Sequence, residues 1–101
     1  MKEFTYAEVG EIEERGQIVK RDFMLLIDGH VYKFSVGTHQ FIESLRQYNE
    51  QFEEELKLDN NILPMDSVVD LAQVVEKIGL MPWEVVAPFL VEQEEPESSS
   101  A

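Results

Sequence analysis

The sequence contains no cysteine and few basic residues, and no apolar run in it approaches the roughly 20 residues that a membrane-spanning helix requires. The lack of cysteine excludes disulfides, thiolate metal sites and cysteine nucleophiles, and it fits a reducing compartment. The first residues also lack the apolar segment of a signal peptide. We therefore expect a soluble cytoplasmic protein that does not contact membranes.

The sequence has many more acidic than basic residues. Eight Lys and Arg residues stand against 21 Asp and Glu residues, which gives a formal net charge of -13. Residues 1–91 hold 17 of these acids and all eight bases, so this part alone carries a net charge of -9. Such a field repels phosphate backbones and anionic membrane surfaces. We expect no direct nucleic-acid binding, and we expect the acidity to serve solubility or to attract a basic partner.

The N-terminal third has the residue pattern of β-strands. Apolar and β-branched residues dominate 3–36, and Gly16 interrupts them. Asp28 and Gly29 separate two such runs, and this dipeptide supplies the positive φ angles of a type I′ turn. The strand Phe23–Ile27 is apolar on both faces, which predicts a central strand covered on both sides, or a second face packed by a helix or by another copy of the chain.

Helical spacing begins at Thr38, which can cap a first helix that ends near residue 58. Its apolar stripe is Phe41, Leu45, Tyr48, Phe52 and Leu56. A second helix follows Pro64, with Asp66 or Ser67 as its cap and Gly79 as the left-handed residue that ends it. Pro82 fits the first turn of a third helix, and Pro88 must kink or end that helix.

Strands followed by helices predict an α+β domain: a small antiparallel β-meander in the N-terminal half, followed by two to three helices packed on one face. At this length one domain is expected, spanning 1–91. Residues 92–101 are rich in Glu, Pro and Ser and lack large apolar side chains. We predict that they form a disordered acidic tail.

The sequence contains no strong catalytic, cofactor-binding or metal-binding motif. His30 and His39 are the only histidines, and His30 with nearby Asp28 makes a poor metal site. There is no nucleophile elbow and no glycine-rich phosphate loop, and the many acids resemble a solvated surface. We therefore expect no catalytic residues, no cofactor and no metal, and we interpret the protein as a non-enzyme.

The pattern Leu71–Gly79–Val85 has some of the spacing of a helix-turn-helix, because a first helix is expected to end at Gly79 and Pro82 could start a second one. Between residues 64 and 93 there is a single base, Lys77, and Pro88 shortens the second helix. Recognition helices need basic and amide side chains toward DNA. We therefore interpret 79–91 as a core segment or as an apolar surface for a partner.

Our leading hypothesis is an acidic protein–protein interaction module, such as an adaptor, an assembly factor or a chaperone-like accessory protein. Its anchor is predicted around Met81, Trp83 and Phe89, because Trp is favoured at binding hot spots. The strand Phe23–Ile27, which is apolar on both faces, is the other candidate surface, for a partner or for a second copy in a homodimer. Acidic residues are expected to steer a basic protein partner.

The alternative hypothesis is a nucleic-acid mimic that inhibits a DNA- or RNA-binding protein. A mimic requires carboxylates spaced like phosphates along a rigid face. The candidates lie along the long first helix: Glu43, Glu50, Glu53, Glu54 and Asp59. Salt should weaken binding by a mimic steeply, whereas binding through an apolar anchor should be less sensitive.

Overall fold

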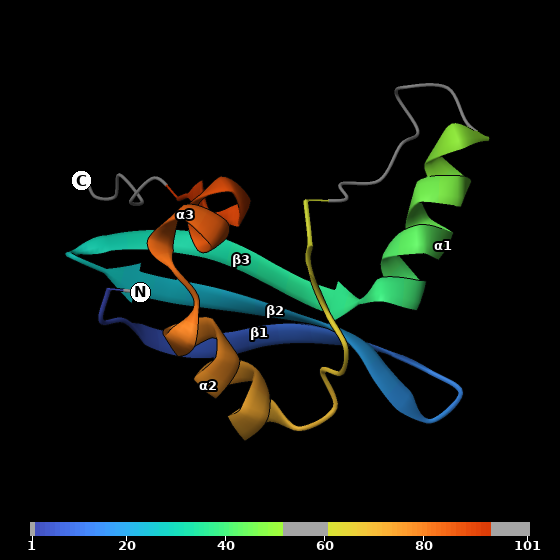
Figure 1. Ribbon diagram of the computed structural model, residues 1–101, viewed down its shortest axis with the longest axis horizontal. Helices are drawn as coiled ribbons and strands as arrows, with labels where there is room; N and C mark the ends of the chain where they lie inside the picture. Colours follow the sequence, from blue (N-terminus) through green and yellow to red (C-terminus); the bar gives the residue numbers. More distant parts are fainter. Residues whose placement is uncertain (1, 52–60, 94–101) are drawn as a thin grey trace, which may run out of the picture.

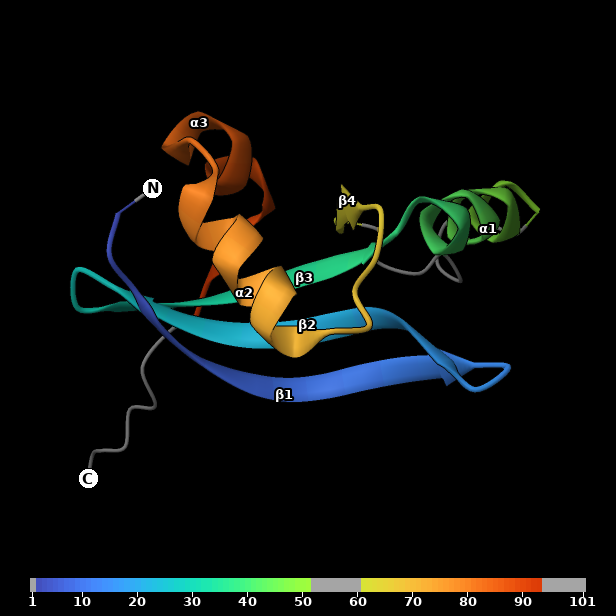
Figure 2. The same cartoon turned by 60° about the horizontal axis from the view of Figure 1, so that its bottom comes forward.

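The computed structural model describes residues 2–51 and 61–93 (Figures 1 and 2). Within these ranges the chain forms a β-sheet in its N-terminal half and helices mainly in its C-terminal half. The predicted α+β class is thereby confirmed. Phe52, Leu56, Glu53, Glu54 and Asp59 lie outside the described residues, as does the predicted tail from residue 94 onward.

Three long strands form the predicted antiparallel meander: β1 (Thr5–Glu14), β2 (Gln17–Ile27) and β3 (His30–Thr38). Asp28 and Gly29 have φ angles of 52° and 82°, which confirms a turn with positive φ at both central residues. Arg15 and Gly16 form the β1–β2 turn in the same way, with φ angles of 56° and 78°. Strand β2 lies between the other two and is therefore central, as predicted.

Two short strands complete the sheet on the free side of β3. Strand β4 (Leu63–Met65) pairs with the end of β3 in parallel, and β5 (Val91–Glu92) pairs antiparallel near its start. The sheet is therefore antiparallel except for the β3–β4 pair. Pro64 sits inside β4, which an edge strand tolerates because its outer side needs no amide donor. Glu92, the first residue of the predicted tail, belongs to β5.

Helix α1 (His39–Glu50) follows β3 directly, and the Thr38 hydroxyl accepts a hydrogen bond from the Phe41 amide as its N-cap, as predicted. Helix α2 (Leu71–Leu80) begins later than expected. Its cap is Asp70, whose carboxylate accepts from the Ala72 and Gln73 amides, so the predicted caps at Asp66 or Ser67 were wrong.

The α2–α3 connection also differs from expectation at one residue. Gly79 lies inside α2 without a positive φ, so the prediction that it ends the helix in the left-handed conformation was wrong. Helix α3 (Trp83–Val86) follows Pro82, and the 3₁₀ helix η2 (Ala87–Phe89) contains Pro88. The α-helical hydrogen bonding therefore stops before Pro88, as its missing amide requires.

The helices are not equivalent in position. Helices α2 and α3 lie over one face of the sheet, whereas α1 projects beyond the far end of β3 (Figure 2). The core forms between that face and the helices α2 and α3. Its most deeply buried side chains, each at most 2% exposed, come from two strands, the α2 region and α3: Phe23, Leu25, Ile27, Phe34, Val36, Val68, Val74, Ile78 and Val86.

Arg21 of β2 hydrogen-bonds to the segment that precedes α2 and thereby holds it against the sheet. Its side chain is buried, and its Nε and Nη2 donate to the carbonyl oxygens of Val68 and Val69, each at 2.7 Å. Its Nη1 pairs with the carboxylate of Glu8 on β1. A guanidinium can serve all these acceptors because its donors form a rigid fork. One β2 side chain thereby fixes where the chain enters α2.

Candidate interaction surfaces

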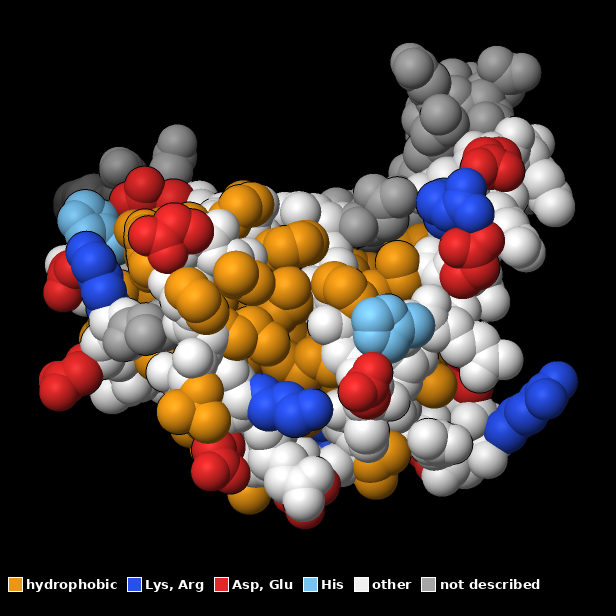
Figure 3. Space-filling view, viewed as in Figure 1, with side chains coloured by type: hydrophobic (Ala, Val, Ile, Leu, Met, Phe, Trp, Pro, Cys, Tyr) orange, Lys and Arg blue, Asp and Glu red, His pale blue; other side chains and the backbone are white. Residues whose placement is uncertain are grey.

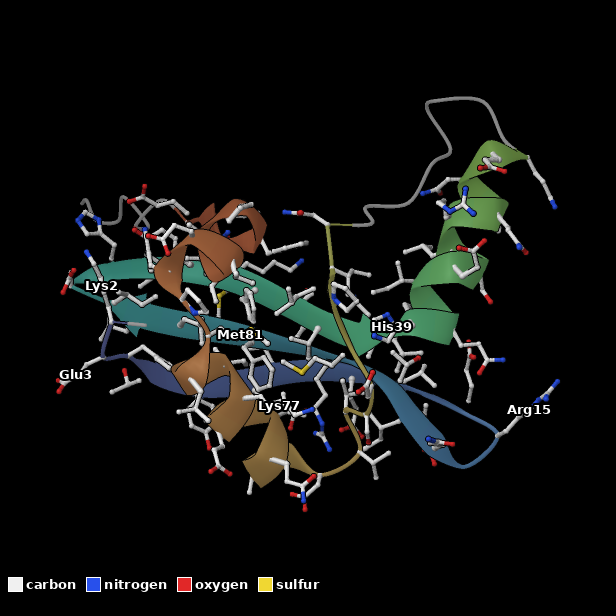
Figure 4. All side chains as sticks on the ribbon, in the orientation of Figure 1. Lys2, Glu3, Arg15, His39, Lys77 and Met81 are labelled. Atoms are coloured by element: carbon white, nitrogen blue, oxygen red, sulfur yellow. The ribbon has the colours of Figure 1, made fainter. Side chains whose placement is uncertain are left out.

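The three predicted anchor residues lie near the α2–α3 connection, but none of them is fully exposed. Met81, Trp83 and Phe89 are each partly buried and pack against the core. The Lys2 ammonium lies 5.1 Å from the centre of the Trp83 ring, and it also pairs with Asp28 at 3.0 Å. Figure 4 shows Lys2 beside α3 and Met81 in the link between α2 and α3. The Trp83 ring therefore packs against the core and also lies close to the Lys2 ammonium.

Two neighbours of these residues are more exposed. Leu80 is 76% exposed, more than any other large apolar side chain in the described ranges, and Val85 is 43% exposed. We call Leu80, Met81, Trp83 and Val85 the corner patch. Figure 3 shows apolar side chains gathered over α2, α3 and the adjoining part of the sheet.

Sequence reasoning overlooked Leu80, although a signal for it was present. The apolar positions of α2 that face the core are Leu71, Val74, Val75 and Ile78. Leu80 falls two residues after Ile78, which places it on the opposite side of a helix. The expectation that the helix ended at Gly79 hid this relation.

The predicted acidic residues lie elsewhere in the molecule. Glu50 is on α1, which projects from the end of the sheet opposite α3, so it does not adjoin the corner patch (Figure 1). Arg46 lies between Glu43 and Glu50 and pairs with both, at 2.8 Å to Glu50. The hydrogen bond from Arg46 lowers the pKa of Glu43, and the same contact raises the pKa of Arg46. Two Glu and one Arg leave α1 a net charge of -1.

A second apolar surface lies on the sheet face that α2 and α3 leave uncovered. Residues alternate between faces along a strand, so Met24 and Leu26 of β2 point away from the core that holds Phe23 and Leu25. Their cross-strand neighbours share this face, and we call the set the open sheet face: Thr5, Ala7, Met24, Leu26, Val31, Lys33 and Val91.

The open sheet face is hollowed at its centre. A shallow depression of about 240 Å³ is lined by Thr5, Ala7, Met24, Leu26 and Val31, together with the adjoining parts of Tyr6 and Leu25. Leu26 is 46% exposed within it. No helix among the described residues lies on this face (Figure 2), so within them no helix covers the second face of strand Phe23–Ile27, and covering by a second copy stays a prediction.

A larger hollow of about 360 Å³ lies between the β1–β2 turn and the start of α1. It is lined mainly by polar residues: Glu14, Arg15, Gln17, Val19, Thr38, Gln40, Phe41 and Ser44. The two histidines lie outside it. His30 is 3.0 Å from Glu92, and His39 is 3.3 Å from Asp66. Within the described ranges no three metal-ligating side chains come together.

No helix in the described part of the chain is long and apolar enough to cross a membrane. Comparison with known proteins finds no match to this chain, whether among family models, curated proteins or solved structures.

Proposed function

We propose that the protein is a non-catalytic interaction module that binds a protein partner through the corner patch. The observation that carries this proposal is the exposure of Leu80, at 76%, in the same short stretch as the 43%-exposed Val85 and the partly exposed Met81 and Trp83. Burying one such leucine in an interface is worth about 1.5–3 kcal/mol. A cluster containing a tryptophan is also typical of interface hot spots.

The charge of the chain indicates what kind of partner fits. Exposed Glu76 and Glu84 flank the corner patch on α2 and α3, and the whole chain carries a net charge of -13. A basic protein would be attracted by this field and would then contact the apolar side chains. Roles of this type include adaptors, assembly factors and chaperone-like accessory proteins. The cytoplasm is the proposed location, which the cysteine-free composition fits.

The test is affinity purification from the native host with the full chain as bait, at low and at high salt. The variant Leu80→Ser removes the most exposed apolar side chain of the corner patch. Leu26→Ser is the matched control, since it makes the same change on the opposite side of the sheet. We expect the wild type and Leu26→Ser to capture the same partner, and Leu80→Ser to lose most of it.

Capture that is unchanged by Leu80→Ser would contradict the proposal. If that capture also disappeared at high salt, charge alone would hold the partner, as a nucleic-acid mimic requires. The ion pairs that Arg46 makes with Glu43 and Glu50 count against α1 as the surface of such a mimic, because they reduce its negative charge.

A further inference from the structure

Strand β1 is a long edge of the sheet whose outer side has no partner strand among the described residues. The free side of β3, by contrast, is paired with β4 near its end and with β5 near its start. Strand β1 spans ten residues, Thr5–Glu14, along the border of the sheet (Figure 2). An unpaired strand edge presents a row of amide and carbonyl groups that can pair with another chain. Strand β1 is therefore where this sheet can accept a further strand.

Acidic side chains are concentrated along this edge. Strand β1 carries no base and four acids: Glu8, Glu11, Glu13 and Glu14. Buried Arg21 of β2 pairs with Glu8 and, at 3.4 Å, with Glu11, so the four Glu and one Arg have a net charge of -3. Within the described ranges no ion pair joins Glu13 or Glu14 to a base. A basic segment is therefore attracted to the edge, and an acidic one is repelled.

The two faces of β1 differ in character, and this difference specifies the side chains of a strand added beside it. Glu8 and Glu11 lie on the face of the helices, where both pair with Arg21. Ala7 lies opposite Met24 and so belongs to the open sheet face. An added strand alternates its own side chains between the same two faces. Basic side chains fit beside the glutamates on one face, and apolar side chains extend the open sheet face on the other.

We propose that the outer edge of β1 binds an extended protein segment in which basic and apolar residues alternate, and that this segment joins the sheet as a further strand. Main-chain hydrogen bonds to β1 supply affinity, and the alternating side chains supply specificity. A second copy of the chain does not fit this edge. Pairing β1 with β1 would place Glu near Glu, and like charges across strands are destabilising.

The irregular pairing of β1 with β2 sets the expected length of the contact. The register shifts after Glu8 and again after Ile12, which leaves Thr5–Glu8 and Gly10–Ile12 as regularly paired stretches. Shifts of this kind bend a strand and interrupt its ladder of hydrogen bonds. We therefore expect the bound segment to pair over about four to eight residues, a usual strand length.

The experiment uses the full chain and a fluorescein-labelled synthetic peptide of alternating lysine and valine, about eight residues long. Fluorescence anisotropy measures its binding, and we expect a dissociation constant below about 100 µM. Amide hydrogen exchange measured by NMR locates the peptide. At saturation, the β1 amides that point away from β2 should exchange more than about tenfold more slowly, whereas β3 amides should keep their rates.

The control peptide has the same sequence with N-methylated backbone amides. It keeps every charge and side chain but cannot donate main-chain hydrogen bonds, so it should bind at least about tenfold more weakly. This control separates pairing with the strand edge from attraction by charge alone.

Two double variants of the protein test the charge of the edge. Glu11→Gln with Glu13→Gln removes two exposed charges from β1 and should weaken binding of the peptide by roughly three- to tenfold. Glu76→Gln with Glu84→Gln removes two exposed charges from α2 and α3 and is the matched control, since the net charge changes equally. It should weaken binding by less than about twofold. Leu80→Ser should leave binding unchanged, so this proposal and the corner patch can fail separately.

Four outcomes would overturn the proposal. The first is no binding at about 1 mM peptide. The second is equal binding of the N-methylated peptide, or equal weakening by the two double variants, because charge alone would then hold the peptide. The third is exchange that slows outside β1 and not within it. The fourth is slowed exchange of β1 amides when the protein is concentrated without peptide, which would assign the edge to a second copy.

Discussion

The two faces of the β2 segment Phe23–Ile27 are both apolar in sequence, but helices among the described residues cover only one of them. Phe23, Leu25 and Ile27 are buried beneath α2 and α3, whereas Met24 and Leu26 point to a face that no described helix covers. Alternation along the strand assigns residues to faces, but only the later part of the chain decides which face it covers. Apolar residues on both faces of this segment therefore give a core on one side and a candidate interface on the other.

The adjacent leucines of β2 test this difference most strongly. Leu25 is 1% exposed and Leu26 is 46% exposed. Leu25→Ala should lower the free energy of unfolding by about 2–5 kcal/mol, because it leaves a cavity in the core. Leu26→Ala should cost less than about 1 kcal/mol in dilute protein. Urea unfolding measures both, and equal losses would contradict the assignment of the two faces.

Arg21 should matter for holding the covering helices in place. Arg21→Met should lower the free energy of unfolding by about 3 kcal/mol, because Glu8 and the carbonyl groups of Val68 and Val69 lose their donors. Arg46→Met is the control, since Arg46 also has two carboxylate partners but is exposed on α1. Its loss should be far smaller, because solvent screens exposed ion pairs. The structural account of Arg21 fails if the two variants unfold at the same urea concentration.

The start of α2 gives the smallest of the expected effects. Asp70→Ala should cost about 1 kcal/mol, because the Ala72 and Gln73 amides lose their acceptor. Ser67→Ala should cost less than about 0.5 kcal/mol, because Ser67 lies before the helix and accepts one long hydrogen bond, from Val69 at 3.4 Å. Thermal unfolding compares the two variants. A larger loss for Ser67→Ala would move the cap back to the position that the sequence suggested.

Local signals in the sequence predicted most elements of the fold. The Asp28–Gly29 turn, the cap at Thr38 and the stop before Pro88 depend on residues close in sequence, and all three were confirmed. The start of α2 was missed because it depends on distant partners. Residues 63–65 pair with β3, and Arg21 of β2 holds the carbonyl groups of Val68 and Val69. Neither contact can be predicted from the spacing of residues that are close in sequence.

The candidate surfaces were predictable to a smaller extent. The apolar outer face of β2 followed from its alternation, although its openness did not. Leu80 could have been found from its position off the stripe of α2. The half-buried state of Trp83 could not, because it depends on packing against the core and on Lys2, 81 positions earlier in the chain.

Oxidation of the methionines tests the contrast between the two faces most directly. Met24 lies on the open sheet face, Met65 in the core and Met81 in the corner patch. With hydrogen peroxide and peptide mass spectrometry, we predict that in dilute protein Met24 is oxidised several times faster than Met65. Oxidation of Met24 as slow as that of Met65 would contradict the account.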